Sequence, residues 1–329
     1  MTAVQPERRP RPSAEATAPP LVPPPGTTGP RAAQVGRAAA ALVRGVRPKQ
    51  WVKNALVVSA PLAAGRLHDP GTAGATGLAF AAMTCAASAV YLVNDVHDRH
   101  EDRLHPTKRL RPVASGDLPV TTAAVVAAVL GCAAGGLAAA ASAPFAALVA
   151  FYVGVSLLYT WRLRRVALVE IAVVASGFVV RAAAGGLAAH LPVSSWFLLV
   201  AGAGSVFVVA GKRASELAAH GTTAGGRAVL AEYSPGYLRF LWTSAATVTV
   251  VAYAAWANIV LVARDDGTWA LWSVAPFALA VLRYAWDVDR GRAEAPEDVV
   301  LRDRALLVLG AIWFVLFAVG AASVDFDGH

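Results

Sequence analysis

Residues 118–161 read LPVTTAAVVAAVLGCAAGGLAAAASAPFAALVAFYVGVSLLYTW, a run of 44 residues without one charged side chain. An α-helix needs about 20 apolar residues to cross the hydrocarbon core of a bilayer. The run is long enough for two such helices, and Ser142, Ala143 and Pro144 mark a turn near its middle. It therefore predicts two membrane-spanning helices joined by a short connection.

Apolar segments of similar length occupy most of the remaining chain. With the run above they give eight predicted spans, and a ninth is expected between Lys53 and Arg66, where 12 uncharged residues are available. We therefore expect an all-α polytopic membrane protein with about nine transmembrane helices. The further segments are 70–94, 166–188, 193–211, 240–263, 268–286 and 305–324.

The composition agrees with a protein in a bilayer. Hydrophobic residues make up 57% of the 329 residues and charged residues only 15%, against about 25% in soluble domains. The two cysteines, Cys85 and Cys132, lie in apolar runs, which excludes a disulfide scaffold. The net charge of +8 does not indicate a nucleic-acid partner, because basic residues in a membrane protein set its orientation.

The chain divides into a tail and one domain. Residues 1–30 hold nine prolines and almost no large apolar residue, so they cannot bury enough surface to offset their ordering entropy. We expect a disordered cytoplasmic tail there and a single transmembrane catalytic domain over residues 31–329.

Lysine and arginine are unevenly distributed between alternate connecting segments. With nine spans, 22 of the 29 basic residues lie in segments on the side of the N-terminus, and only Arg66 and Arg264 lie in loops on the other side. Basic residues concentrate in cytoplasmic loops. We therefore expect a cytoplasmic N-terminus. The alanine- and arginine-rich composition fits a GC-rich bacterial source, so the expected location is a bacterial plasma membrane.

Residues 91–102 read YLVNDVHDRHED, at the end of an expected span. Asp95, Asp98 and Asp102 are spaced i, i+3 and i+7, so on a helix they line one face, with Asn94 beside Asp98. Three such carboxylates repel one another unless a cation lies among them, and oxygen ligands of this kind suit Mg²⁺. The motif predicts a catalytic Mg²⁺ site at the membrane boundary; the alternative is a solvated helix end.

Two basic segments flank this motif in the sequence. Lys108, Arg109 and Arg111 follow it and could hold the phosphates that the metal also holds. Arg47, Lys49 and Lys53, beside a tryptophan, come before the first span and could take a lipid phosphate from the membrane surface. The alternatives are an ordinary basic cytoplasmic loop and an ordinary interfacial anchor.

Two charges lie within the fifth predicted span. Glu170 and Arg181 are 11 residues apart, which is close to three full helical turns and places them on one face. An uncompensated charge inside a bilayer is costly, so both should face the protein interior. Structural pairing with other helices is the alternative to a functional role.

The sequence from 94 to 116 resembles the first aspartate-rich motif of the UbiA-type intramembrane prenyltransferase superfamily. Its pattern is N-D-x-x-D-x-x-x-D from Asn94, then K-R-x-R-P from Lys108 and S-G from Ser115. The resemblance covers about residues 40–325. It implies helices around a central cavity, with an active site at the cytoplasmic side that binds a diphosphate through Mg²⁺.

The second motif departs from most of that superfamily. Relatives with aromatic acceptors carry another aspartate cluster after the sixth span, where this chain has Lys212, Arg213 and Glu216. Together with the later pattern R-x-x-L-x-x-Y-S, which includes Tyr233, and the basic segment 47–54, this resembles the decaprenyl-phosphate phosphoribosyltransferase branch.

That resemblance implies a specific reaction. The donor would be phosphoribosyl pyrophosphate, the acceptor a polyprenyl (decaprenyl) phosphate, and the product a precursor of cell-wall arabinan. Lys212 and Arg213 would hold the lipid phosphate, with Glu216 orienting Arg213 or a ribose hydroxyl. A conventional prenyltransferase with a small aromatic acceptor is the alternative, and a transporter is a third. The lipid chain length and the oligomeric state, a homo-oligomer included, stay open.

Overall fold

The structure is a computed structural model that describes residues 31–221, 228–261 and 268–322. The predicted N-terminal tail lies outside these residues. Every regular element within them is helical. The long helices are α3 (Pro70–His97), α6 (Val120–Ala141), α7 (Ala143–Trp161), α8 (Val169–Ala188), α9 (Ser195–His220), α10 (Pro235–Trp256), α11 (Thr268–Asp289) and α13 (Arg304–Ala322). The shorter ones are α1 (Arg31–Val46), η1 (Pro48–Val58), α2 (Ser59–Ala63), α4 (Arg99–Leu104), η2 (Lys108–Leu110), α5 (Pro112–Ser115), η3 (Leu163–Arg165), η4 (Ala228–Glu232), η5 (Ala257–Leu261) and α12 (Pro296–Arg302).

Short polar side chains cap the long apolar helices. The Ser142 hydroxyl accepts a hydrogen bond from the Phe145 N–H, which starts α7 directly after α6 ends. Asp69 caps α3, and Ser194 and Ser234 cap α9 and α10 in the same way. Each cap satisfies an N–H that the first helical turn leaves without a partner. The turn predicted at Ser142 is therefore confirmed.

The all-helical prediction is confirmed, whereas the count of nine spans is not. Six described helices are long and apolar enough to cross a membrane: α3, α6, α7, α8, α9 and the segment Pro235–Ile259. The last two predicted spans are also helical, as α11 and α13. Helix α11 has 22 residues but is not among the six apolar enough to qualify, and the apolar described part of α13, Arg304–Val319, is shorter than they are.

The first predicted span, between Lys53 and Arg66, is not one long α-helix. It is divided into η1, a 3₁₀-helix of 11 residues, and α2, with five residues. A 3₁₀-helix rises about 2.0 Å per residue against about 1.5 Å in an α-helix, so the two pieces reach roughly 30 Å. Because η1 begins at Pro48, this length includes the basic residues Lys49 and Lys53 as well as the apolar stretch.

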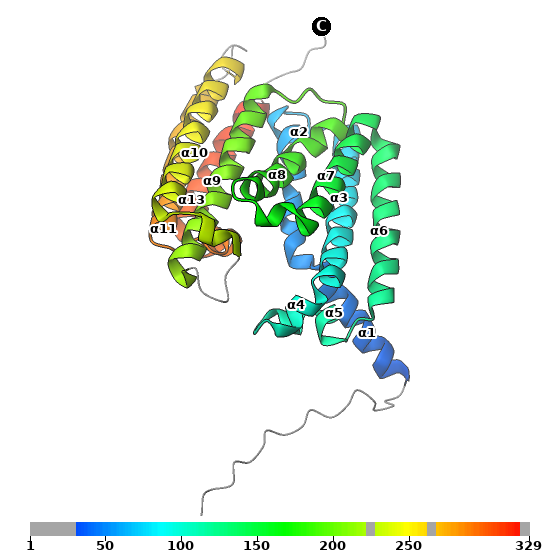
Figure 1. Ribbon diagram of the computed structural model, residues 1–329. Coiled ribbons are helices and arrows are strands. Elements are labelled where there is room, and N and C mark those ends of the chain that lie inside the picture. The colour runs from blue at the N-terminus through cyan, green and yellow to red at the C-terminus, as the bar shows by residue number, and fades with distance from the viewer. Residues whose placement is uncertain (1–30, 222–227, 262–267, 323–329) are drawn as a thin grey trace, which may run out of the picture.

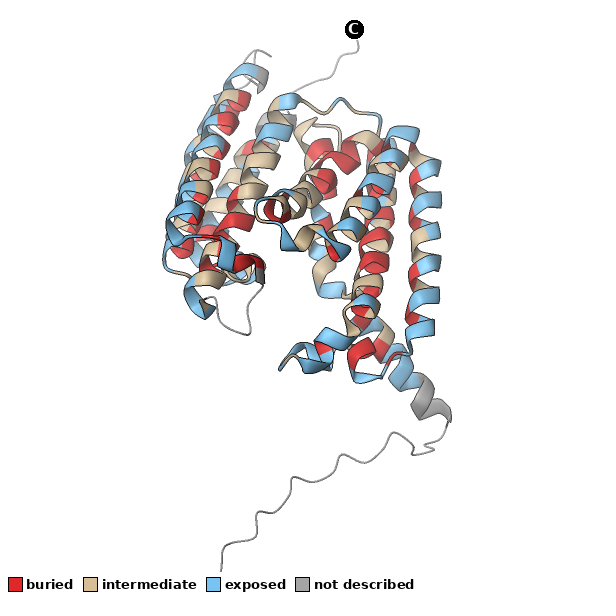
Figure 2. Ribbon diagram, in the orientation of Figure 1, coloured by how far each residue is buried: buried red, intermediate tan, exposed pale blue. Residues whose placement is uncertain are grey.

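The long helices form two groups joined through the middle of the molecule (Figure 1). Helices α3, α6 and α7 pack together, as do α9, α10, α11 and α13, and both groups contact α8. Buried residues follow the faces that the helices turn toward one another, and exposed residues follow the outer faces (Figure 2). Helix α8 is therefore the element whose side chains meet both halves.

Glycine lets η1 pack directly on α8. A Cβ atom at Gly185 would lie only 2.0 Å from the carbonyl oxygen of Val57, so no other residue fits without moving the backbone. This close approach brings η1, with Lys53 and Asn54, against the middle of the bundle.

Candidate active site

The predicted acidic motif lies at a bend between two helices. Helix α3 ends at His97, Asp98 has backbone angles of φ −83° and ψ 0°, and α4 begins at Arg99. The expectation that three aspartates line one face of a single helix is therefore wrong. Asp95 and Asp102 are buried, at 1% and 3% exposure, while Asp98 turns toward a different neighbour.

Three arginines from three elements contact these aspartates. Arg111 Nη1 lies 2.7 Å from Asp102 Oδ2 and 3.4 Å from Asp95 Oδ1. Arg164 Nη1 donates to both oxygens of Asp98, at 2.8 and 3.0 Å. Arg47 also donates to Asp95 Oδ1. Of these three, only Arg111 was predicted at the aspartate motif.

The sequence predicted Arg47 in the basic entry segment and not beside the aspartates, and it did not single out Arg164. Both lie in segments that positive-inside topology alone would make basic. Arg47 adopts a left-handed conformation, with φ 54°, which a non-glycine residue rarely keeps without a role at a site. Arg164 lies in η3, between α7 and α8. The signal that would have found them is contact with an aspartate, which only the fold supplies.

The fit of these residues to a metal ion rests on one oxygen. Within the described residues, no three His, Cys, Asp or Glu side chains form a group that could hold a metal ion; Asp95 and Asp102 share Arg111, whereas Asp98 pairs with Arg164. However, Asp95 Oδ2 is buried and has no hydrogen-bond partner in the described chain. A buried carboxylate oxygen without a partner suits a hard cation such as Mg²⁺.

The other residues predicted around this motif differ in position. Asn94 accepts a hydrogen bond from the Thr160 hydroxyl of α7, which fixes its amide beside the aspartates. Lys108 and Arg109 are exposed in η2, and Lys49 is exposed in η1. Of the predicted basic residues that follow the aspartates, Arg111 is the one that points at them.

Lys212 and Arg213 of α9 have different surroundings. Arg213 is buried, with its Nε and Nη2 atoms 2.8 and 2.7 Å from the two carboxylate oxygens of Glu170 and Nη1 2.7 Å from Glu216. The Lys212 side chain is 35% exposed, and its Nζ lies 3.8 Å from Glu216. The geometry thus ties Arg213 to two carboxylates and leaves Lys212 as the more accessible cation.

Tyr233 contacts the segment that precedes α8. Its hydroxyl accepts a hydrogen bond of 2.7 Å from the Leu168 N–H. Leu168 has φ 64° and precedes α8, so this bond holds the unusual turn from which α8 starts. Tyr233 itself is buried, at 6% exposure, and its predicted contact with substrate stays a prediction.

A second charged group joins α9 to η1 and α12. Lys53 Nζ lies 3.8 Å from Glu297 Oε1, and Lys212 is close enough to act on both charges. Burial alone would raise the pKa of Glu297, but its own backbone N–H, Lys53, Lys212 and Gln50 hold that pKa below its ordinary value. Sequence analysis missed Glu297, since nothing in its local pattern separates it from a solvated helix start.

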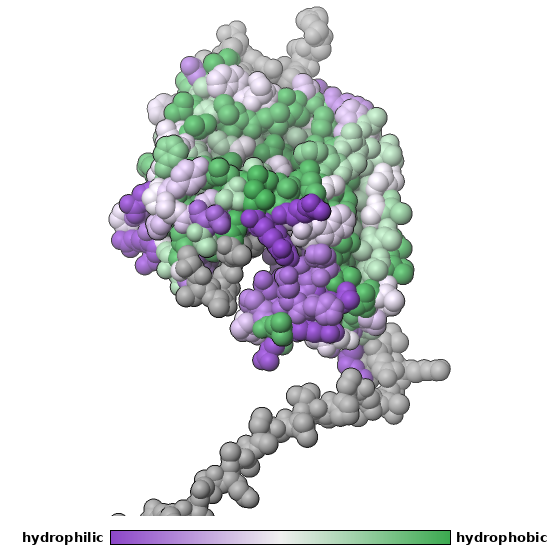
Figure 3. Space-filling view, in the orientation of Figure 1, coloured by the Kyte–Doolittle hydropathy of each residue, from purple (hydrophilic) through white to green (hydrophobic). Residues whose placement is uncertain are grey.

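Tyr91 is near charges from both groups. The guanidinium of Arg47, which also contacts Asp95, lies 5.0 Å from the centre of the Tyr91 ring. Tyr91 is also within electrostatic reach of Arg181 and Glu297. Hydrophilic side chains gather at this end of the molecule, around α4 and α5, below a body with a largely hydrophobic surface (Figure 3). The aspartates and the lysines therefore belong to one polar region.

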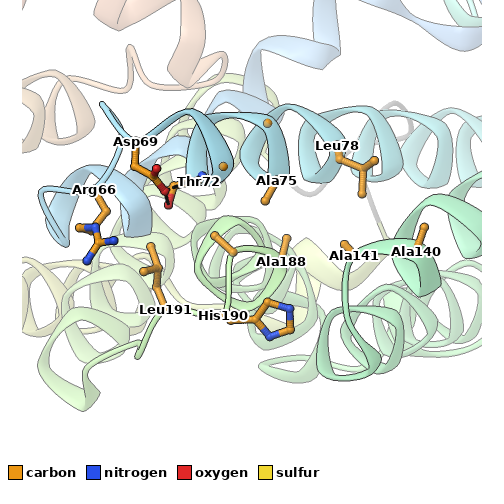
Figure 4. Close-up of a pocket in the computed structure, with 13 residues that line it drawn as sticks. Arg66, Asp69, Thr72, Ala75, Leu78, Ala140, Ala141, Ala188, His190 and Leu191 are labelled. Carbon is orange, nitrogen blue, oxygen red and sulfur yellow. Dashed lines mark hydrogen bonds between the residues drawn. The ribbon is translucent and has the colours of Figure 1, made fainter. Parts of the chain in front are cut away.

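A separate cavity lies at the other end of α3. Its volume is about 620 Å³, and Arg66, Asp69, Leu191 and His190 are among its lining residues (Figure 4). Asp69 and Asp95 bracket almost the whole of this 28-residue helix, whose length is about 40 Å. The cavity is thus remote from the acidic motif and has no part in the site described above.

Comparison with known proteins agrees with this geometry. Residues 55–309 match the model of the UbiA prenyltransferase family. The chain belongs to this family. It is 46% identical over 290 residues to the decaprenyl-phosphate phosphoribosyltransferase of Mycobacterium tuberculosis, covering 86% of this chain and 94% of that protein. The enzyme of the same name from Mycolicibacterium smegmatis is 42% identical, with 85% of this chain and 92% of that protein covered.

Solved structures show the same fold. A UbiA homolog from Archaeoglobus fulgidus bound to DMAPP and Mg²⁺ superposes with a TM-score of 0.65 at 16% identity, covering 86% of this chain and 99% of that one. The resemblance predicted from the aspartate-rich motif is therefore confirmed at the level of family and fold. As a UbiA family member with several apolar helices, the protein is a multi-pass membrane transferase.

Proposed function

We propose that this protein transfers the 5-phosphoribosyl group from phosphoribosyl pyrophosphate to a polyprenyl phosphate, with decaprenyl phosphate as the expected acceptor. The observation that carries the proposal is the identity of 46% and 42%, over most of each chain, with two decaprenyl-phosphate phosphoribosyltransferases. The replacement of the second acidic cluster by Lys212 and Arg213 supports it, since cations suit a phosphate acceptor.

The aspartate end would bind the pyrophosphate of the donor. Asp95, Asp98 and Asp102, with Asn94, would hold Mg²⁺, which when bound supplies positive charge to the leaving pyrophosphate. Arg47, Arg111 and Arg164 already lie beside these carboxylates. Their guanidinium groups can turn from the aspartates to phosphate oxygens, which offer the same two-pronged contact.

The basic residues around Lys212 would orient the acceptor. A phosphate oxygen of the lipid attacks carbon 1 of the ribose while the bond from carbon 1 to the pyrophosphate oxygen breaks and its electron pair leaves with pyrophosphate. A phosphate monoester is largely ionised at pH 7, so no general base is needed. Lys212 would hold this phosphate in line with the breaking bond, and such positioning accounts for a large part of the rate. In-line attack inverts the anomeric carbon.

The membrane setting completes the proposal. The distribution of basic residues supports an N-terminus and an active site on the cytoplasmic side of a bacterial plasma membrane, where the phosphorylated sugar donor is made. The lipid-linked product would supply precursors for cell-wall arabinan.

The test is an assay of the purified protein with two donors. Phosphoribosyl pyrophosphate with polyprenyl phosphate should give a lipid-linked phosphoribose and pyrophosphate. A prenyl diphosphate with an aromatic acceptor should give no product under the same conditions. Product in the second reaction and none in the first would overturn the proposal in favour of conventional prenyl transfer.

A further inference from the structure

Arg181 is a buried cation in the C-terminal half of α8. Its exposure is 6%. Nε donates to Asn54 Oδ1 at 2.8 Å, Nη1 to the Gly177 carbonyl at 2.6 Å, and Nη2 to the Tyr152 hydroxyl at 2.9 Å. Its guanidinium also lies 4.9 Å from the centre of the Tyr152 ring.

All of these partners are uncharged. Within the described residues, no carboxylate forms an ion pair with Arg181, and its acceptors are an amide, a carbonyl and a phenol. A guanidinium has five N–H donors, and the described chain uses three of them. A full positive charge is thus enclosed in protein without a counter-charge, which is unfavourable in a membrane interior unless a ligand supplies one.

The surroundings add positive charge and little negative charge. Asn54, which holds Arg181, is preceded in η1 by Lys53, and Lys53 is within electrostatic reach of both Arg181 and Lys212. The one carboxylate paired with Lys53 in the described chain is Glu297, at 3.8 Å. Lys212 also pairs with Glu216, at 3.8 Å, so Glu297 and Glu216 serve the two lysines and no described carboxylate is left for Arg181. An anionic ligand would supply the missing negative charge.

We propose that Arg181, together with Lys53, forms a binding site for a phosphate monoester inside the bundle, separate from the aspartate end that takes the diphosphate. This inference rests on the proposed function. Two monoesters take part in that reaction: the 5-phosphate of the donor and the phosphate of the lipid acceptor. A prenyl diphosphate offers neither group to this site, so Arg181 would select phosphoribosyl transfer over prenyl transfer.

Asn54 and Tyr152 are positioning residues in this proposal. They fix the guanidinium plane from opposite sides through Nε and Nη2, so that the remaining N–H groups stay available to phosphate oxygens. Arginine suits this role because its planar fork matches two phosphate oxygens at once, whereas lysine offers a point charge.

The test measures equilibrium binding to the purified full-length protein in Mg²⁺, without turnover. The ligands are phosphoribosyl pyrophosphate, inorganic pyrophosphate and a short-chain polyprenyl phosphate, each added alone. The variants are Arg181→Gln, Arg181→Lys and Lys53→Gln. Arg66→Gln, at the other end of α3, is the matched arginine control and should bind all three ligands as the wild type does.

Arg181→Gln should raise the Kd of one monoester ligand about 10-fold or more, the scale of a lost charge-assisted contact, and leave inorganic pyrophosphate unchanged. A selective loss for phosphoribosyl pyrophosphate assigns the site to the donor's 5-phosphate. A selective loss for polyprenyl phosphate assigns it to the acceptor. Arg181→Lys should show a smaller loss for the same ligand.

Unchanged Kd values for both monoesters in folded Arg181→Gln would overturn the inference. If that variant does not fold, Lys53→Gln decides in the same way, because it removes the neighbouring cation from a more accessible position. A wild-type protein that binds neither monoester would instead contradict the proposed function itself, so the two failures are distinguishable.

Discussion

Helix α8 buries two charged side chains and surrounds them in opposite ways. Glu170, near its start, is fully buried and forms two hydrogen bonds with Arg213, which also contacts Glu216. Arg181, three turns further on, is nearly as buried but has only uncharged partners in the described chain. The charges of Glu170 and Arg213 thus compensate each other, whereas no described carboxylate compensates the charge of Arg181.

The difference separates structural charges from functional ones. A buried ion pair with every group satisfied holds two helices, α8 and α9, in a fixed relation and has little left to offer a ligand. A buried cation without a counter-charge is kept despite its cost, which points to a ligand that completes it. The sequence pattern placed Glu170 and Arg181 on one helix face as equals, and the fold distinguishes them.

The largest effect is expected from breaking the buried ion pair between Glu170 and Arg213. Glu170→Gln leaves the buried Arg213 with one carboxylate in place of two, and breaking a buried pair costs about 3–5 kcal/mol. The unfolding temperature of the purified protein should fall clearly. The double variant Glu170→Gln with Arg213→Met should recover part of that loss. If Glu170→Gln alone unfolded like the wild type, the pair would not be the structural element described here.

A smaller effect, on turnover, is expected from the aspartates. Asp95→Asn should lower turnover about 100-fold or more, the scale of losing a preorganised electrostatic group. Its unfolding temperature should fall less than that of Glu170→Gln, because Arg47 and Arg111 are each 28% exposed and can turn to solvent. Removing divalent ions with a chelator should abolish activity, and added Mg²⁺ should restore it. Full activity in the chelator would contradict the metal role, whatever the variants do.

Substitutions of the neighbouring residues Lys212 and Arg213 should affect different properties, the first the reaction rate and the second the stability. Lys212→Ala should lower the rate with polyprenyl phosphate about 10- to 100-fold, because a contact to a charged group contributes roughly 1.5–3 kcal/mol. Arg213→Ala should mainly lower the unfolding temperature. Steady-state kinetics and thermal unfolding on both variants make the comparison. Wild-type kinetics for Lys212→Ala would show that this lysine is an ordinary basic residue of a cytoplasmic loop.

Without ligand, the protein should tolerate the loss of the Arg181 charge. Replacing an uncompensated buried ion by a neutral side chain is often neutral or stabilising, so Arg181→Gln should change the stability of the ligand-free protein by no more than about 1 kcal/mol. Thermal unfolding without ligand provides the measurement. A collapse as large as that of Glu170→Gln would place Arg181 in the same structural class as Arg213.

The smallest effect concerns pH and Glu297. Its folded pKa lies below its ordinary value of 4.5, so its contribution to stability is present above that value and is lost as the pH falls through the folded pKa. Wild type should therefore be slightly more stable than Glu297→Gln at neutral pH, and the difference should shrink below about pH 4.5. A difference that grows on acidification would contradict the ion pair with Lys53.

Several features of this protein could be predicted from local sequence alone. The uncharged run at 118–161 requires apolar helices because unpaired backbone groups are too costly in a bilayer. Ser142 between the two helices, and the acidic motif at the end of α3, follow from the same local reasoning. Residue types at fixed spacing also identified the family, since the N-D-x-x-D-x-x-x-D pattern depends only on neighbours in the chain.

Only the tertiary structure decided which charged side chains contact which partners. Arg164 reaches Asp98 across 66 residues, Arg213 reaches Glu170 across 43, and Arg181 reaches Asn54 across 127. The bend at Asp98 and the close approach of η1 to α8 at Gly185 set these contacts. Hydropathy and spacing are properties of short segments, whereas the balance of a buried charge depends on side chains from distant segments. The sequence therefore determined a membrane transferase with an acidic motif, and the fold decided that Arg213 pairs with carboxylates while Arg181 has uncharged partners in the described chain.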